Sequence, residues 1–296
     1  MADKKVHLVL GSGGARGIAH IGVIEALEET GHQIISVTGC SMGAVVGGIY
    51  AAGFQRDYKE WLIKLTKPQV FRLLDFTLSG QGFLKGERVF SVLQALTGPQ
   101  NIEKFKIPFT AVAADMVNDK EVHYREGDLY KALRASIAIP GIFTPVVQNG
   151  QFLVDGGVLN PLPLNLVTKK QGELVVAVNL SGRPTVPRVA QDDAEETQAV
   201  LKWLSSIMRY AGTKEKELLP TAEYSLRELL VSSYRMTQDR LTNLMLIAYP
   251  PDILIEVPRN VCSTFEFFKA KTLLELGREL GYQALSAREA NTMARR

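Results

Sequence analysis

The chain contains only two cysteines, and it lacks the sequence features of disulfide-rich, zinc-binding, transmembrane and secreted proteins. The two cysteines, Cys40 and Cys262, are too few and too far apart to indicate a disulfide scaffold or a zinc site. No run of about 18 apolar residues occurs, so no transmembrane helix is predicted. The apolar stretch near the N-terminus is short and is followed by glycines, which argues against a signal peptide. We therefore expect a cytoplasmic protein.

Charge of one sign is also scarce. The 296 residues include 34 Lys and Arg against 31 Asp and Glu, a formal net charge of +3, and no dense basic block occurs. This balance gives no reason to expect a nucleic-acid partner, although a mild basic bias permits peripheral contact with an anionic membrane surface. A hydrophobic share of 46% and a charged share of 22% are ordinary for a globular protein.

Apolar strands alternate with helices along most of the chain, and glycine-bearing turns connect them. This alternation predicts a three-layer α/β/α sandwich with a mainly parallel central sheet. Strands are expected at 6–10, 34–38, 109–114, 122–124, 143–147, 151–154 and 173–178, and helices at 18–30, 44–52, 58–65, 87–96 and 129–138. Pro68 is expected to end the helix at 58–65, before an irregular segment at 70–86.

The chain is expected to divide into three parts. Residues 1–182 form the core, 183–197 form a polar linker or mobile loop, and 198–296 form a mostly helical extension packed on the core. The extension is predicted to have helices at 200–210 and 224–247, a strand at 253–257 and two final helices. It could complete the fold, cover the site or pair subunits; a homo-oligomer is compatible with the sequence but does not follow from it.

A candidate nucleophile follows the second predicted strand. Gly39-Cys40-Ser41-Met42-Gly43 matches G-x-S-x-G between a strand and a helix, the context that a nucleophile elbow requires. The glycines permit a sharp turn that exposes the Ser41 hydroxyl at the helix N-terminus, where the helix dipole favours negative charge. The Met42 amide is predicted to point toward the same oxyanion. Any glycine-rich turn can contain a serine by chance, so the pattern alone is a hypothesis.

A glycine-rich loop, Gly11-Ser12-Gly13-Gly14-Ala15-Arg16-Gly17, follows the first strand. It lacks the acidic residue that a dinucleotide-binding loop needs about 20 positions later, and the Gly-Lys-Ser/Thr ending of a P-loop. Because both glycine-bearing turns follow adjacent strand–helix units, they lie at one sheet edge. The amides of Gly13 and Gly14 are therefore predicted to face the Ser41 hydroxyl and stabilise an oxyanion. Arg16 supports this loop, attracts an anionic headgroup or is simply a surface arginine near a helix start.

The residue that accepts the Ser41 proton has to be found elsewhere in the chain, and histidine is the usual acceptor for a serine. The chain order of the α/β-hydrolases needs a histidine after the acid, and here the last histidine precedes the best acid. His123 stays a reserve candidate, and the other three are interpreted as structural: His7, His20 and His32. Asp155 ends an apolar strand, where α/β sheets build their sites. The alternative interpretation of Asp155 is a turn residue of an Asp-Gly pair.

A carboxylate makes a weak base unless its surroundings change it. The reference pKa of aspartate is about 3.9, and desolvation is needed to raise it toward neutrality. A Ser41–Asp155 pair therefore requires either this desolvation or electrostatic stabilisation of the transition state.

Three motifs in this order closely resemble the patatin-like phospholipases. They are Gly-x-Gly-Gly-x-Arg-Gly after the first strand, Gly-x-Ser-x-Gly after the second and Asp-Gly-Gly after a later strand. The resemblance is to the bacterial branch in particular, through Asp155-Gly-Gly-x-x-Asn-Pro-Leu-Pro and the later Asp239-Arg240-Leu241-Thr242 and Pro250-Pro251-Asp252-Ile253. It covers about residues 6–180, with weaker echoes to 257. Ser12 replaces the first loop glycine of plant-type members, as is common in the bacterial branch.

The resemblance implies a fold and a chemistry. It implies a Ser41–Asp155 dyad, an oxyanion hole from the Gly13 and Gly14 amides, and Arg16 at the family's basic position. The hypothesis is a lipid ester hydrolase that works through an acyl-enzyme, with neither metal nor cofactor. The rival hypotheses are an acyltransferase that uses the same acyl-enzyme and a regulatory protein with an esterase-like fold. The apolar stretch at 70–84 is expected either to pack as an ordinary loop or to act as an acyl pocket or lid.

Overall fold

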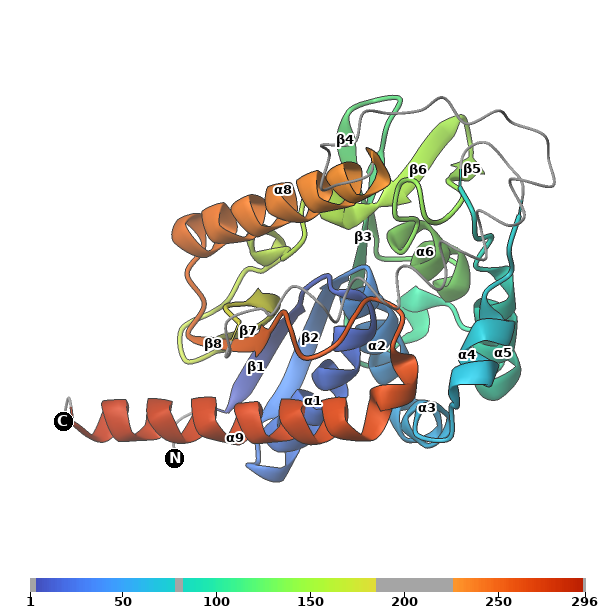
Figure 1. Cartoon of the computed structure of the whole chain (residues 1–296). Helices are drawn as coiled ribbons and strands as arrows, with labels where there is room; N and C mark the ends of the chain where they lie inside the picture. The colour runs from blue at the N-terminus through green and yellow to red at the C-terminus, as the bar shows by residue number, and fades with distance from the viewer. Residues whose placement is uncertain (1–3, 78–81, 185–225, 295–296) are drawn as a thin grey trace, which may run out of the picture.

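The computed structural model describes residues 4–77, 82–184 and 226–294, which form a sheet between two layers of helices (Figure 1). Five strands run parallel in the order β3-β2-β1-β7-β8, and the shorter β4, β5 and β6 are antiparallel. The strands are β1 (Lys5–Leu10), β2 (Gln33–Cys40), β3 (Phe109–Asp115), β4 (Lys120–Tyr124), β5 (Val146–Gln148), β6 (Gln151–Asp155), β7 (Leu174–Gly182) and β8 (Ile253–Pro258). The predicted, mainly parallel sheet is confirmed.

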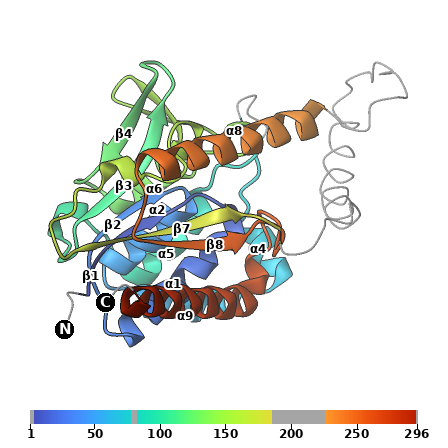
Figure 2. The ribbon, with the colours of Figure 1, turned by 90° about the vertical axis from the view of Figure 1, so that its left-hand side faces the viewer.

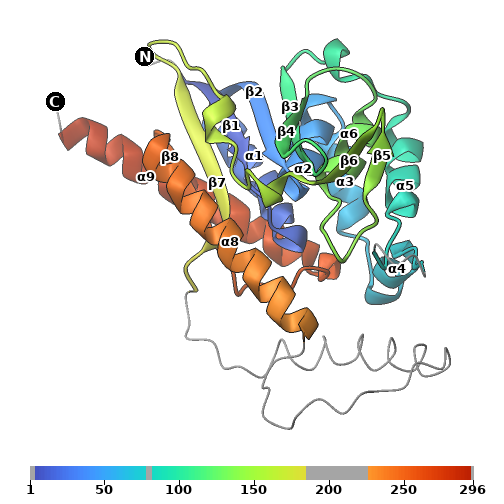
Figure 3. The ribbon, with the colours of Figure 1, turned by 90° about the horizontal axis from the view of Figure 1, so that it is seen from above.

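Helices cover both faces of this sheet. The helices are α1 (Ala19–Glu29), α2 (Met42–Ala51), α3 (Gln55–Leu62), α4 (Lys67–Leu73), α5 (Glu87–Thr97), α6 (Leu129–Ser136), α8 (Leu226–Ala248) and α9 (Ala270–Ala294). Figure 2 shows α8 on one face and α1 and α9 on the other, and Figure 3 looks down on α8 where it crosses the sheet obliquely. The predicted three-layer sandwich is confirmed.

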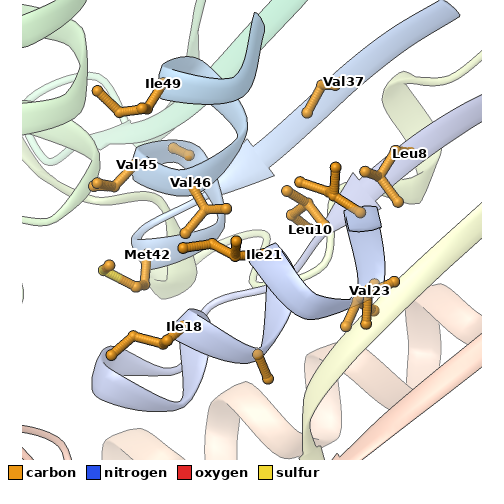
Figure 4. Close-up of a cluster of buried hydrophobic side chains, with 14 of the residues drawn as sticks. Leu8, Leu10, Ile18, Ile21, Val23, Val37, Met42, Val45, Val46 and Ile49 are labelled. Carbon is orange, nitrogen blue, oxygen red and sulfur yellow. The ribbon is translucent and has the colours of Figure 1, made fainter. Parts of the chain in front are cut away.

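The central strands are apolar on both sides because both faces are covered. In β1, Val6, Leu8 and Leu10 pack into the main core, whereas Val9 packs into a smaller cluster beneath α8. Figure 4 shows side chains of α1 and α2 gathered against Leu8 and Leu10 of β1. The main core therefore holds the first two strand–helix units, and the turns between them, in one rigid arrangement.

Two of the helix predictions are wrong. Pro68 does not end a helix but stands in the first turn of α4, where its missing N–H has no intrahelical partner to lose. The helix begins with a capping box between Thr66 and Gln69, so part of the predicted irregular segment is helical. After β8 the chain forms a short 3-10 turn (Phe267–Lys269) and then the single long helix α9, in place of two helices.

The C-terminal part of the chain joins the sheet directly. β8 pairs with β7 as a parallel edge strand, and α9 packs against α1. The two helices approach so closely that a Cβ on Gly22 would lie 2.1 Å from the Leu274 carbonyl oxygen. Most of the predicted linker at 183–197 and the predicted helix at 200–210 lie outside the described residues. Within the described ranges, no helix has both the length and the apolar character needed to span a membrane.

Candidate active site

The register of β3 explains why the ends of β2 and β6 meet. β4 pairs with β3 along residues 111–115 and so occupies one edge of that stretch. On the other edge, β2 pairs with β3 as far as Val112, and β6 pairs with it from Ala113 onward. Since β2 is parallel to β3 and β6 is antiparallel, the C-terminal ends of β2 and β6 point at each other.

This arrangement brings the predicted nucleophile and base together. Cys40 and Asp155 end the two strands opposite consecutive residues of β3, and Ser41 follows Cys40 directly. The Ser41 hydroxyl donates to Oδ2 of Asp155 at 2.6 Å. Both side chains are buried, with Ser41 2% and Asp155 0% exposed. A serine hydroxyl is thus hydrogen-bonded to a carboxylate in a site from which most water is excluded.

Ser41 has a backbone conformation that few non-glycine residues adopt, with φ 54° and ψ −122°. Such a conformation typically costs about 1–3 kcal/mol and persists only where the surroundings impose it. Here the surroundings are backbone: a Cβ on Gly43 would lie 2.2 Å from the Leu10 carbonyl oxygen, and one on Gly39 would lie 2.4 Å from that of Gly43. The turn presents the Ser41 hydroxyl at the N-terminus of α2, as the G-x-S-x-G pattern predicts.

Asp155 is held in place from several sides. Its amide donates to the Ala138 carbonyl at 2.9 Å, and its Oδ1 accepts the Gly157 amide at 2.7 Å. Burial raises the pKa of Asp155 to about 6, against the weaker lowering effects of the hydrogen bonds from Ser41, Gly157 and Cys40. The carboxylate therefore has the raised basicity that a proton acceptor for an alcohol requires.

The glycine loop packs directly onto the residue after the nucleophile. A Cβ on Gly17 would lie 2.3 Å from Cγ of Met42, so no larger residue fits there. Three loop amides are bonded to carbonyls of neighbouring segments: Gly11 to Val178, Ser12 to Pro161 and Ala15 to Thr264, at 2.9–3.0 Å. Between them, the amides of Gly13 and Gly14 have no acceptor in the part of the chain that the structure describes.

The Met42 amide is the third donor predicted for the oxyanion. It belongs to the first residue of α2, where no intrahelical acceptor exists. The role of the Gly13, Gly14 and Met42 amides as an oxyanion hole stays a prediction.

Arg16 links the glycine loop to the segment after β8. Its guanidinium donates to the Arg259 carbonyl at 2.9 Å, in the segment that follows β8. A Cβ on Gly14 would lie 2.8 Å from the Thr264 carbonyl oxygen, in the same segment. The glycine loop thus packs against the C-terminal part of the chain, and the role of Arg16 stays a prediction.

Three residues near the site were missed by the sequence reasoning. Ser136, at the end of α6, accepts the Ser41 amide at 2.9 Å. Tyr234 and Gln238 extend from α8 to Gly157, next to Asp155. No local signal marks any of the three, because each is brought to the site by the packing of a distant helix.

Each of the four histidines has a partner other than Ser41 in the described structure. The contacts are His7 with Ser36 at 2.6 Å and Glu173 at 2.8 Å, His20 with the Gly11 carbonyl at 3.0 Å, His32 with Thr30 at 2.9 Å and His123 with Glu121 at 2.7 Å. Ser36, His7 and Glu173 form a second serine–histidine–acid contact. Ser36 lies inside β2, however, and not at a strand-to-helix turn.

No metal site is apparent among these groups. Within residues 4–77, 82–184 and 226–294, no cluster of three His, Cys, Asp or Glu side chains is arranged to hold an ion.

Comparison with known proteins agrees with this geometry. The model of the patatin-like phospholipase family matches residues 8–168, which include the glycine loop, Ser41 and Asp155. The chain belongs to the patatin-like phospholipase family. Membership supports a lipid hydrolase in general, and it confirms the resemblance that the three motifs indicated. Tyr234, Gln238 and Arg259 lie beyond the matched residues.

Relatives extend the similarity over nearly the whole chain. An NTE family protein of Mycobacterium tuberculosis is 36% identical, over 97% of this chain and 93% of its own length. Lysophospholipase NTE1 of Cryptococcus neoformans is 29% identical, over 96% of this chain but only 17% of its own length. Among solved structures, VipD from Legionella pneumophila aligns with 97% of this chain and 67% of its own, with a TM-score of 0.47 and 16% identity.

Proposed function

We propose that this patatin-like phospholipase hydrolyses carboxylic ester bonds of phospholipids or lysophospholipids through a Ser41–Asp155 dyad and an acyl-enzyme. The observation that carries the proposal is the 2.6 Å hydrogen bond from the Ser41 hydroxyl to Asp155 in a buried site. The name of the lysophospholipase relative supports a phospholipid substrate.

In the first half-reaction Ser41 Oγ attacks the ester carbonyl carbon and its proton moves to Oδ2 of Asp155. The carbonyl electron pair moves to oxygen, and the amides of Gly13, Gly14 and Met42 donate hydrogen bonds to that oxyanion. One such donor is typically worth about 10²–10³ in rate. The tetrahedral intermediate then collapses, the bond to the leaving oxygen breaks, and Asp155 returns the proton to that oxygen.

In the second half-reaction water replaces the alcohol. Asp155 takes a proton from water as the water oxygen attacks the acyl carbon, and the same amides stabilise the second oxyanion. Collapse breaks the bond to Ser41 Oγ, which regains a proton from Asp155, and a fatty acid is released. A pKa of about 6 suits both halves, because the carboxyl is ionised near neutral pH and is still acidic enough to return its proton.

The test compares two serine-to-alanine variants of the same chain. Ser41→Ala should abolish hydrolysis of a chromogenic acyl ester and labelling by a fluorophosphonate, with the fold intact. Ser36→Ala is the matched control, because Ser36 also contacts a possible base, His7. It should keep both activities. Hydrolysis that survives Ser41→Ala, or that is lost in Ser36→Ala, would contradict the proposal.

We also propose that an apolar segment beside the dyad meets the lipid. The amides of Phe83 and Leu84 donate to the Ile142 carbonyl, in the turn after α6 whose Ala138 carbonyl accepts the Asp155 amide. The Phe83 side chain is 40% exposed. An exposed ring on a segment that this turn links to Asp155 suits contact with an acyl chain or a bilayer surface. The cytoplasmic location stays a prediction.

A further inference from the structure

Two polar side chains of α8 stand beside the general base. Tyr234 and Gln238 are four residues apart and so lie on one face of the helix. The Gln238 side-chain amide donates a hydrogen bond to the Tyr234 hydroxyl oxygen at 2.9 Å. This bond occupies a lone pair of the phenol and directs the phenol proton away from Gln238.

Both groups converge on Gly157, the residue whose amide binds Asp155. A Cβ built on Gly157 would lie 2.2 Å from the Gln238 amide nitrogen, 3.0 Å from Oδ1 of Asp155 and 3.2 Å from the Tyr234 hydroxyl oxygen. These three polar atoms therefore surround one point next to Gly157. The phenol oxygen of Tyr234 therefore lies next to Asp155 of the dyad.

The phenol proton has no acceptor among the described residues. Tyr234 is half-buried, and burial together with the nearby Asp155 charge raises the pKa of its phenol well above the ordinary value. The hydroxyl is therefore protonated at any working pH and is a neutral donor. A donor that is oriented by one partner, lies next to a carboxylate and has no acceptor within the described ranges is suited to a substrate oxygen.

We propose that Tyr234, oriented by Gln238, is a further catalytic residue that donates a hydrogen bond to the leaving-group oxygen of the ester. The proposal rests on the Ser41–Asp155 mechanism above. As the bond between the acyl carbon and this oxygen breaks, its electron pair moves to the oxygen. Asp155 supplies the proton that neutralises it, and Tyr234 stabilises the developing charge without losing its own proton.

A leaving-group comparison separates this role from a structural one. For a 4-nitrophenyl ester the leaving oxygen needs little help, whereas for a methyl ester of the same fatty acid it carries most of the charge in the transition state. Because both esters form the same acyl-enzyme, kcat/KM reports the step in which they differ. We expect Tyr234→Phe to lower kcat/KM roughly 10- to 100-fold for the methyl ester and by less than about threefold for the 4-nitrophenyl ester.

Two further variants complete the test. Gln238→Leu leaves the phenol without its orienting donor. It should also lower kcat/KM more for the methyl ester than for the 4-nitrophenyl ester, but by a smaller factor. Tyr249→Phe replaces an exposed tyrosine just beyond α8 and should leave kcat/KM unchanged for both esters. An equal loss on both esters, or no loss on either, would overturn the role of Tyr234 while leaving the dyad intact. Wild-type protein without any Ser41-dependent hydrolysis would overturn both proposals.

Discussion

The backbone amide of Ser41 donates a hydrogen bond to the Ser136 hydroxyl at 2.9 Å, and that hydroxyl donates in turn to the Val112 carbonyl at 2.7 Å. Ser136 is completely buried. The hydroxyl thus ties the nucleophile turn at the end of β2 to the strand β3 on which both Cys40 and Asp155 depend for their positions. A side chain from α6 helps to hold the strained backbone of Ser41.

Ser136→Ala should therefore harm both stability and activity. It leaves the Ser41 amide and the Val112 carbonyl short of a partner in a dry site, and an unsatisfied buried group costs about 1–3 kcal/mol. We expect the free energy of unfolding in urea to fall by that amount and fluorophosphonate labelling of Ser41 to slow. Ser91→Ala, which removes an exposed hydroxyl bonded to the Glu87 carbonyl, is the control and should cost less than about 0.5 kcal/mol.

The pH dependence of hydrolysis should report Asp155. Because its pKa is raised to about 6 and the base acts only when ionised, kcat/KM should be constant above about pH 7 and should fall as pH drops through about 6. The measurement is hydrolysis of a neutral ester across this range. His123→Ala should leave the profile in place, and a profile that moves in that variant would transfer the role of base to histidine.

The same pKa makes a prediction about stability. Between about pH 4 and pH 6 the folded protein keeps a proton on Asp155 that the unfolded chain has lost, so stability falls as pH rises through this window. Above about pH 6 the carboxylate is charged, and its burial destabilises the folded protein. Asp155→Asn should abolish activity yet raise the free energy of unfolding near pH 8, by up to about 3 kcal/mol, with the gain vanishing near pH 4.

Asp75→Asn is a contrasting variant for this measurement. Asp75 is also buried, but its carboxylate accepts the backbone amides of Gly86, Glu87 and Arg88 at the start of α5. Its replacement should lower stability near pH 8. If Asp155→Asn lowers the free energy of unfolding to the same extent at both ends of the pH range, the buried charge of Asp155 does not destabilise the folded protein.

The sequence could predict the parts of the site that depend on local patterns. The glycine loop and the turn at Ser41 each follow an apolar strand directly, so strand, turn and helix are specified within about 20 residues. The prediction for Pro68 is wrong because a proline just after one helix and a proline in the first turn of the next give similar local patterns. The capping box between Thr66 and Gln69 identifies the second case.

The contact between Ser41 and Asp155 depends on information that no local pattern contains. The motifs name both residues, but the contact follows from β2 and β6 sharing one edge of β3, with the change at Val112 and Ala113. Tyr234 and Gln238 were unpredictable for the same reason. The approach of these residues to Gly157 depends on how α8 crosses the sheet.

Phe83→Glu should weaken binding to lipid vesicles. A charged side chain in place of an exposed ring opposes insertion among acyl chains, so flotation with phosphatidylcholine vesicles should fall by about tenfold, while hydrolysis of a water-soluble ester is kept. Met293→Glu is the control, because Met293 is 76% exposed near the end of α9, on the opposite face from α8. Equal flotation of both variants and wild type would contradict a role of Phe83 at the lipid surface.

His20 should control the glycine loop without contacting substrate. It is fully buried, and its Nε2 contacts the Gly11 carbonyl at 3.0 Å. Burial lowers the pKa of His20 to about 4, so the ring is neutral at working pH and its Nε2–H donates to that carbonyl. The bond fixes the start of the loop, two residues before the Gly13 amide that the mechanism aims at the oxyanion.

His20→Leu removes this donor and should allow the loop amides to shift. A misplacement of about 1 Å can cost up to about 100-fold in rate, so we expect kcat to fall roughly 10- to 100-fold with KM little changed. His20→Gln should restore much of the rate, because a glutamine amide can donate to the same carbonyl. His32→Leu, which affects a turn contact with Thr30 away from the loop, should keep full activity. If the leucine variant at position 20 turns over as fast as wild type, the loop is held by its other backbone hydrogen bonds alone.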